Sequence, residues 1–477
     1  MNEGLLISGQ GGEQERIRKM ANLFLLFALI FGLILIFIEP PFVIPDEYKH
    51  YINICRISHG GVFPDVENKM IGSYITAEEK NFLEIFEGLY VNNDNIYDLH
   101  SAVAHSQRIP DSTMVFYPTT DATIKPTPYL IPAVTIAIVR FFLGSLNAFN
   151  AYLVAKLANL VFYAVIVRWA LLRTKALHNT MFLLALMPMT IFQAASASYD
   201  SCLMASSFLL FAFLTKILLS DADCQICRED VFAICLASVF LVGVKIAYAP
   251  ILLVLLAIPI VKFGSLKRYF QCIGLVAGIA VLFYLAPSIV IRVISANAET
   301  VLTEAEIAQQ AYIRENFWVF PKMVWKTTLY YHDFWEESFF GILGWLDTRF
   351  PKFFVTLFFF ALVSTALTEV SSIQNLCWKA RLFSWAGITT FFIGSVCKMY
   401  VSWNPVLGIV GGEIAHGMQG RYFIPIALFM IVVLANPLLC RLKFRKTIDG
   451  FRANAVPVTA LISSIMTVLV VFIRYWM

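Results

Sequence analysis

The stretch that decides the fold class is "ANLFLLFALIFGLILIFI", residues 21–38, an almost wholly apolar run. As an α-helix it would be about 27 Å long, close to the hydrocarbon thickness of a bilayer. The basic segment "ERIRKM" (15–20) precedes it, and it runs directly into "EPPF" (39–42). A cleaved signal peptide has a shorter apolar core and a small-residue cleavage site. We therefore expect residues 21–38 to be an uncleaved first transmembrane helix.

The composition extends this expectation to the whole chain. The 477 residues are 59% hydrophobic and 14% charged, and the mean hydropathy is +0.73. Soluble domains are about 25% charged, and a soluble fold of this size could not bury so much apolar surface. The sequence predicts an all-α polytopic membrane protein. The net charge of +4 is small, and the basic residues form short clusters between apolar runs, which orients a membrane protein and argues against a nucleic-acid partner.

The distribution of basic residues also selects a topology. Counting every apolar window would give twelve spans and would place "RTK" (173–175), "KFGSLKR" (262–268) and "RLKFRKTIDGFR" (441–452) outside, against the positive-inside rule. If 129–143, a short segment that contains Pro132 and Arg140, is not counted as a span, all three basic segments lie on the inside. We expect this segment to lie as a helix at the outer interface. Eleven spans remain: 21–38, 150–171, 181–198, 201–219, 231–247, 249–262, 270–291, 353–370, 382–400, 422–439 and 456–473.

This topology predicts one transmembrane domain, residues 21–477, after a cytoplasmic tail of residues 1–20. The N-terminus lies inside and the C-terminus outside. Two large outer loops are predicted: 39–149, with membrane-surface helices, and 292–352. In the second, a polar pattern near 303–316 predicts a short helix, and the aromatic-rich segment after it is expected to lie on the membrane surface.

The first outer loop opens with "FVIPDEYKHYINICRISHGG" (42–61). Pro45 suits the first position of a helix, which would put Asp46 and Glu47 in the first turn, where carboxylates are favoured. Asp46 and His50 are four residues apart and share a face. The two glycines at the end of the stretch predict the end of the helix. On its own, the pattern is explained most simply by helix capping and interfacial anchoring.

Two further polar residues are predicted at the outer ends of spans. Asp200 in "ASASYDS" (195–201) follows small residues that allow close helix packing, and its alternative role is to cap the next helix. Lys245 in "GVKIAYAP" (243–250), three residues before Tyr248, either extends to lipid headgroups or neutralises a bound phosphate.

Two late motifs add arginines at the same boundary. "GILGWLDTRFP" (341–351) and "HGMQGRYFIP" (416–425) each place an arginine at an outer end, against the positive-inside bias. A specific partner and interfacial anchoring both explain such arginines. The span interiors are mostly uncharged, whereas a coupled transporter would place ionisable groups near the midplane. The pattern therefore favours chemistry or binding at the outer membrane surface.

Five motifs in this order carry a resemblance: "PDEYKH" (45–50), "ASASYD" (195–200), "KIAY" (245–248), "GWLDTRFP" (344–351) and "QGRYFIP" (419–425). From about residue 25 to 470 the chain resembles a bacterial membrane family of unknown function that is grouped with the GT-C glycosyltransferases. The resemblance implies a GT-C-like fold in the bacterial inner membrane, with an extracytoplasmic active site. It also implies an inverting transfer of a hexose or pentose from a polyprenyl-phosphate carrier to a glycan acceptor, such as O-antigen or another cell-surface polysaccharide.

The resemblance assigns expected roles to particular residues. Asp46 or Glu47 would be the general base, and His50 would orient it or contact a sugar hydroxyl. Asp200 would be the acidic residue of the second outer loop. The expected phosphate ligands are Lys245, Arg349 and Arg421, and further substrate contacts are expected from Tyr248, Asp347, Gln419 and Tyr422. Some GT-C enzymes use a divalent metal and others none, and because the sequence has no decisive ligand set, no metal is assigned.

Two other functions are consistent with the same residues. One is a transporter or flippase of lipid-linked glycans, and the other is a non-enzymatic subunit of an envelope assembly complex. Mutation of the expected base distinguishes an enzyme from these two alternatives. Replacing Asp46 or Glu47 by its amide abolishes sugar transfer only if the protein is an enzyme.

Overall fold

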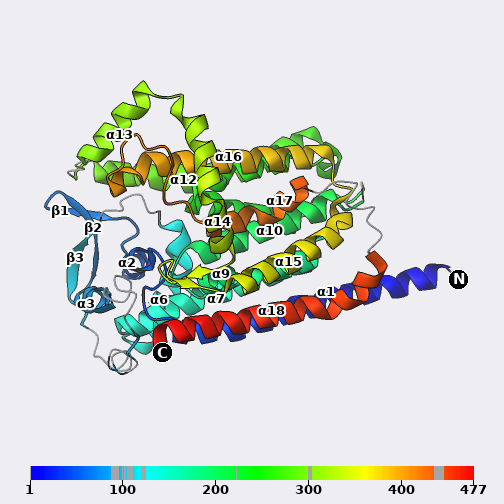
Figure 1. Ribbon diagram of the computed structural model, residues 1–477, viewed down its shortest axis with the longest axis horizontal. Coiled ribbons are helices and arrows are strands. Elements are labelled where there is room, and N and C mark those ends of the chain that lie inside the picture. The colour runs from blue at the N-terminus through cyan, green and yellow to red at the C-terminus, as the bar shows by residue number, and fades with distance from the viewer. Residues whose placement is uncertain are drawn as a thin grey trace.

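The computed structural model describes residues 2–86, 96–98, 100, 104, 111–119, 125–221, 223–298, 303–434 and 445–477. Within them, seven helices are long and apolar enough to cross a membrane, and they run side by side in one bundle (Figure 1). Their apolar stretches are Gly12–Ile38, Ala148–Arg173, Asp200–Leu218, Leu266–Ser295, Lys352–Ile373, Trp378–Leu407 and Ala455–Trp476. The prediction of a helical, multi-pass membrane protein is confirmed.

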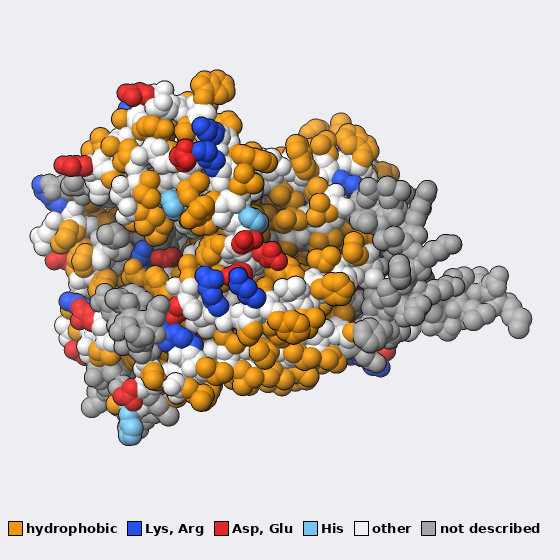
Figure 2. All heavy atoms as spheres, viewed as in Figure 1, with side chains coloured by type: hydrophobic (Ala, Val, Ile, Leu, Met, Phe, Trp, Pro, Cys, Tyr) orange, Lys and Arg blue, Asp and Glu red, His pale blue; other side chains and the backbone are white. Residues whose placement is uncertain are grey.

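The bundle is built around α10 (Asp200–Leu218), which is almost entirely buried between α7 (Ala148–Arg173) and α11 (Arg228–Val244). Helix α1 (Asn2–Ile38) packs along α7 and along α18 (Arg445–Trp476). Hydrophobic side chains predominate along the edge that α1 and α18 form (Figure 2). An apolar outer surface of this kind suits a helix bundle whose solvent is lipid.

Three further long helices complete this set of seven. Helix α12 (Leu266–Ser295) packs on α11, and α16 (Trp378–Ser402) packs on η2 (Ile246–Ala257), which η3 (Ile260–Phe263) follows. Helix α15 (Lys352–Glu369), continued by η4 (Val370–Ile373), contacts α8 (His178–Ala185) and α18.

Four of the eleven predicted spans are helical but do not belong to the seven long helices. Two short helices, α8 (His178–Ala185) and α9 (Pro188–Ala194), share the segment 181–198, which is broken before Pro188 because proline has no N–H to donate. The others are α11, the 3₁₀ segment η2, and η6 (Gly420–Ile426) continued by α17 (Ala427–Leu434). Positions 435–439 of the last of these predicted spans lie outside the described residues. The count of eleven spans stays a prediction.

The segment 129–143, which the topology excludes from the spans, forms η1 (Thr127–Tyr129) and α6 (Leu130–Leu143). Helix α6 packs on α7 and on α2 (Glu47–Ser58) of the first loop. The Nη2 atom of Arg140 donates to Oε1 of Glu79 at 2.6 Å, and Nη1 donates to Oγ of Ser58 at 2.7 Å. These hydrogen bonds attach α6 to Ser58 and Glu79 of the first loop.

The first loop contains α2 (Glu47–Ser58) and α3 (Ala77–Phe86), and also a small antiparallel sheet that the sequence analysis did not predict. Its strands, in spatial order, are β1 (Asp65–Glu67), β2 (Met70–Thr76) and β3 (Met114–Pro118), with Ser73 opposite Tyr117. The strands are too short to produce a clear alternating pattern in sequence.

The start of α2 corrects one detail of the predicted helix. Pro45 is not its first residue, because the helix begins at Glu47 and Asp46 is the N-cap, with a left-handed φ of 64°. The predicted end is confirmed, since the last helical residue is Ser58 and Gly60 adopts a φ of 93°.

The second loop contains α13 (Glu304–Glu315), which confirms the predicted short helix, and α14 (Val319–Phe340), formed by the aromatic-rich segment. A two-stranded hairpin, β4 (Ile342–Leu343) and β5 (Thr348–Arg349), precedes α15. Gln309 of α13 bonds the Tyr400 carbonyl and the Gly411 N–H, near η5 (Pro405–Leu407). The sheet of the first loop and α13 lie at the end of the bundle opposite the N-terminus (Figure 1).

Candidate functional site

Polar and aromatic side chains from five segments meet near the first turn of α2. We call this set the polar cluster. It is formed by Asp46 and His50 of the first loop, Tyr129 of η1, Gln193, Tyr199 and Asp200 around the start of α10, Lys245 and Tyr248 after α11, and Arg421 and Tyr422 of η6.

Asp200 and Arg421 form the buried ion pair of the polar cluster. Their side chains are 12% and 8% exposed, and Nη1 of Arg421 lies 3.6 Å from Oδ2 of Asp200. Gln193 lies between them: with its amide oxygen turned toward Arg421, it accepts from Nη1 at 2.8 Å and donates to Asp200 at 3.3 Å. The Nε atom of Arg421 has no hydrogen-bond partner although it is buried. An unpaired buried donor on a cation favours an anionic ligand.

Asp200 does not cap α10, since Tyr199 is the N-cap and Asp200 is the first helical residue. Its carboxylate lies at the N-terminus of α10 and faces the arginine. The capping alternative for Asp200 is therefore wrong.

Lys245 is the second cation of the polar cluster. It is the C-cap of α11, and its Nζ lies 3.9 Å from the centre of the Tyr422 ring and 5.6 Å from that of Tyr199. The Tyr248 hydroxyl donates to the Tyr422 carbonyl at 2.9 Å and fixes the backbone beneath the ring. Within the described residues, Lys245 forms no salt bridge, so aromatic faces provide its nearest stabilising contacts.

His50 joins the first loop to the polar cluster. Its Nδ1 is 2.7 Å from the Tyr129 hydroxyl, and its ring lies edge-on to Tyr199 with the centroids 4.5 Å apart. Burial lowers the pKa of His50 to about 4, although the Asp46 and Asp200 carboxylates act in the opposite direction. The imidazole is therefore neutral near pH 7 and serves as a hydrogen-bonding group.

Asp46 is the accessible carboxylate of the polar cluster. Its side chain is 50% exposed, it lies 3.4 Å from Lys49 Nζ, and it interacts electrostatically with His50 and Arg421. The left-handed backbone of Asp46 costs about 1 kcal/mol in a residue other than glycine. Strain of this kind is concentrated at functional sites.

Glu47, the neighbouring carboxylate, faces the interior. It is fully buried, and its Oε1 accepts the Ala197 N–H at 2.7 Å. Burial raises the pKa of Glu47. It lies near a second buried pair, in which Lys156 Nζ donates to Oε2 of Glu39 at 2.9 Å. A ligand at the surface reaches Asp46 but not Glu47.

Three predicted substrate contacts lie outside these interactions. Asp347 accepts from Nε of Arg474 at 2.9 Å, and the exposed Arg349 pairs with Glu337 at 2.6 Å. Gln419 is the N-cap of η6, two residues before Arg421, and its buried Oε1 has no partner. The structure thus brings together Asp46, His50, Asp200, Lys245, Tyr248, Arg421 and Tyr422, whereas Asp347 and Arg349 form ion pairs of their own.

Sequence reasoning missed Gln193, Tyr199 and Tyr129 as members of the polar cluster. Tyr199 stands within the quoted motif "ASASYDS", next to Asp200. Gln193 and Tyr129 carry no local signal, because their contacts are made with residues far away in the sequence.

The arrangement can bind an anion next to an accessible base. Arg421 pairs with the buried Asp200, Lys245 lies against aromatic rings nearby, and the Nε–H of the Arg421 guanidinium is unpaired. In the part of the chain that the structure describes, no group of three or more His, Cys, Asp or Glu residues is arranged to hold a metal ion. Comparisons with curated proteins and with solved structures find no match. The family model that matches covers residues 29–430, and the chain therefore belongs to the DUF2142 family of predicted membrane proteins.

Proposed function

We propose that the protein is an inverting glycosyltransferase of GT-C type, in which the polar cluster binds the phosphate of a polyprenyl-phosphate-linked sugar. The observation that carries the proposal is the interaction of Asp46, an accessible carboxylate, with Arg421, in a polar cluster that also contains the cation Lys245. Donor phosphate and acceptor hydroxyl would then meet between a base and a pair of positive charges. The acceptor is a glycan such as O-antigen or another cell-surface polysaccharide.

The reaction needs one base and one site for the leaving group. Asp46 takes the proton of the acceptor hydroxyl as its oxygen attacks C1 of the sugar. The bond between C1 and the phosphate oxygen breaks on the opposite face, so the anomeric configuration inverts. The leaving group is polyprenyl phosphate, whose added negative charge is stabilised by Arg421 and Lys245.

Neutral His50 and buried Glu47 have positioning roles in this proposal. His50 is held by Tyr129 and contacts the Tyr199 ring, so it fixes the first turn of α2 beside the start of α10. Glu47 bonds the segment just before α10. Of the two carboxylates, Asp46 is the one that we propose as the base.

The proposal also places the protein in the bacterial inner membrane with eleven spans. The polar cluster then faces the extracytoplasmic side, where lipid-linked sugars are used. A reporter enzyme fused after residue 175 tests the orientation: activity on the cytoplasmic side is expected, and an extracytoplasmic reporter would contradict it.

The enzymatic test compares Asp46→Asn with the wild type in a bacterial strain that lacks the chromosomal gene. Asparagine tolerates the left-handed backbone, so the variant keeps the fold and loses the base. We expect loss of the transferred sugar from the surface polysaccharide, with unchanged protein level. If undecorated lipid carrier instead accumulates on the cytoplasmic leaflet, the protein is a flippase.

A further inference from the structure

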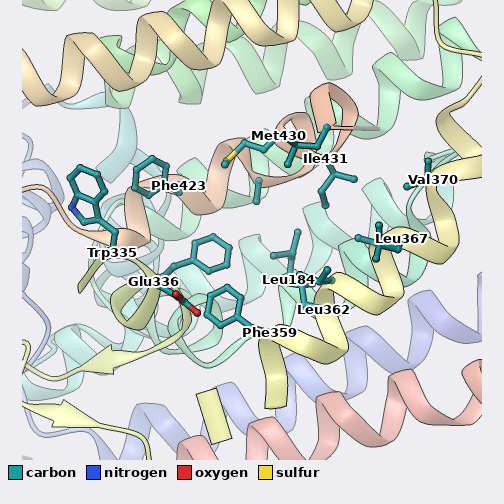
Figure 3. Close-up of a pocket in the computed structure, with 15 residues that line it drawn as sticks. Leu184, Trp335, Glu336, Phe359, Leu362, Leu367, Val370, Phe423, Met430 and Ile431 are labelled. Carbon is teal, nitrogen blue, oxygen red and sulfur yellow. The ribbon is translucent and has the colours of Figure 1, made fainter. Parts of the chain in front are cut away.

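A cavity of about 410 Å³ lies between α14, α15 and α17, beside α8. Fifteen residues line it, nearly all of them apolar, and they include Trp335, Phe359, Ala366, Phe423 and Met430. Of these lining residues only Glu336 is charged, and it lies at the same end as Trp335 and Phe423 (Figure 3). We call this cavity the apolar groove.

The apolar groove extends along segments that belong to the membrane part of the chain. Its α15 wall lies in the candidate span Lys352–Ile373. Its opposite wall follows η6 and α17 from Phe423 to Leu434, on the order of 16 Å along a helix. Val363, Leu367 and Leu434 line it and are 51%, 41% and 71% exposed, so the groove opens sideways. At this depth the surrounding solvent is hydrocarbon.

One end of the apolar groove is joined to the polar cluster. Arg421 and Tyr422 belong to the polar cluster, and Phe423, the next residue, lines the groove. Helix α14 fixes this junction, because Trp335 Nε1 donates to the Met418 carbonyl at 3.0 Å and the Ser338 hydroxyl accepts the Gly420 N–H at 2.8 Å. The same turn of chain thus presents a cation on one side and an aromatic wall on the other.

We propose that the apolar groove holds the isoprenoid chain of the donor whose phosphate lies at Arg421 and Lys245. This inference rests on the proposed function. Its basis is the continuity of the two sites: a buried guanidinium with an unpaired Nε suits an anionic head, and the adjoining lateral groove suits the hydrocarbon attached to that head. Because the bilayer is as apolar as the groove, the chain gains van der Waals packing in the groove, and the anionic head supplies the specificity.

The probe is a polyprenyl phosphate that carries a photoreactive diazirine in its chain, added to the full-length protein in lipid nanodiscs. We expect crosslinks to peptides of α15 and α17. Excess unlabelled polyprenyl phosphate should reduce them about tenfold, whereas phosphatidylglycerol should not compete. Equal competition by phosphatidylglycerol, or crosslinks confined to other helices, would overturn the proposal.

A pair of variants tests the same groove by filling it. Ala366 lines it and is 8% exposed, while Leu357 lies on the same helix, outside the lining, and is 52% exposed. Ala366→Phe should lower groove labelling about tenfold, because the larger side chain occupies space that the isoprenoid chain would fill. Leu357→Phe should label like the wild type. Wild-type labelling of folded Ala366→Phe would contradict the inference.

Failure of this inference is distinguishable from failure of the proposed function. Asp46→Asn leaves the groove intact, so its labelling should equal that of the wild type while its transfer is lost. Groove labelling together with undiminished transfer by Asp46→Asn would reject the glycosyltransferase mechanism and keep the lipid site. Loss of transfer without labelling of α15 or α17 would do the reverse.

Discussion

Glu47 accepts the backbone N–H of Ala197 through Oε1 at 2.7 Å, although the two residues are 150 positions apart. This bond joins the first turn of α2 to the segment that leads into α10. The residue before Glu47 is the accessible Asp46, and three residues after Ala197 is the buried Asp200. The relative position of two carboxylates in the polar cluster is therefore set by a third carboxylate that no surface ligand reaches.

Glu47→Ala should destabilise the fold. The Ala197 N–H would lose its acceptor inside the protein, at a cost of about 1–3 kcal/mol. We expect a lower thermal unfolding temperature of the purified protein in detergent. Asp46→Asn is the control and should unfold close to the wild type, because its side chain is half exposed. Equal stability of Glu47→Ala and the wild type would contradict the positioning role.

Arg421→Lys should weaken binding of polyprenyl phosphate about tenfold, because lysine keeps the charge but loses the planar set of donors. The conservative change leaves a cation opposite Asp200 and so avoids an uncompensated buried carboxylate. Arg349→Lys is the matched control, since Arg349 is 56% exposed and paired with Glu337. Binding measured in nanodiscs decides: a larger loss with Arg349→Lys would restore Arg349 as the phosphate ligand.

The buried, neutral His50 should make the folded protein less stable in mild acid. Its pKa lies at about 4 in the folded protein against an ordinary value of 6.5, so the unfolded chain takes up the proton first as the pH falls. Stability should decrease by about 3 kcal/mol between these two values. His50→Gln removes the titrating group, and its unfolding temperature should fall less between pH 7 and pH 4.5. Parallel pH curves for the two proteins would show that His50 is not held neutral.

Replacing Glu369 should lower the stability of the helix bundle without changing the polar cluster. Its carboxylate accepts the N–H groups of Asn179 and Thr180 at 3.0 and 2.9 Å, and so caps the start of α8 from the end of α15. Glu369→Ala should cost about 2 kcal/mol of stability. Glu315→Ala, at the exposed end of α13, should change it by less than about 0.5 kcal/mol. Thermal unfolding of both variants in detergent tests the difference.

The sequence predicts the membrane class and much of the polar cluster for a physical reason. Long apolar runs are expensive in water, and cations such as Lys245 and Arg421 stand out because the predicted topology puts them at outer helix ends, which the positive-inside rule disfavours. Which polar side chains pair with one another cannot be predicted in this way, because pairing depends on tertiary contacts. Nothing near Arg349 in sequence selects Glu337 as its partner, and nothing near Gln193 places it between Asp200 and Arg421.

The same limit explains the first loop. Strands of three to seven residues give too few positions for a periodic signal, so the sheet went unpredicted, whereas the capping box of Thr303 and Glu306 marks the start of α13 in the sequence itself. The shorter helices η2 and α17 are apolar throughout, and composition does not separate a full span from a shorter buried helix.

Sugar transfer with Asp46 as the base is tested by the mass of the surface polysaccharide repeat in cells that carry wild-type protein, Asp46→Asn or no protein. We expect the repeat from Asp46→Asn cells to have the same mass as the repeat from cells without the protein. Decoration should be at least about 100-fold lower than in the wild type, because a general base contributes that much to the rate. Immunoblots should show equal amounts of both proteins. A fully decorated repeat in Asp46→Asn cells would contradict the account.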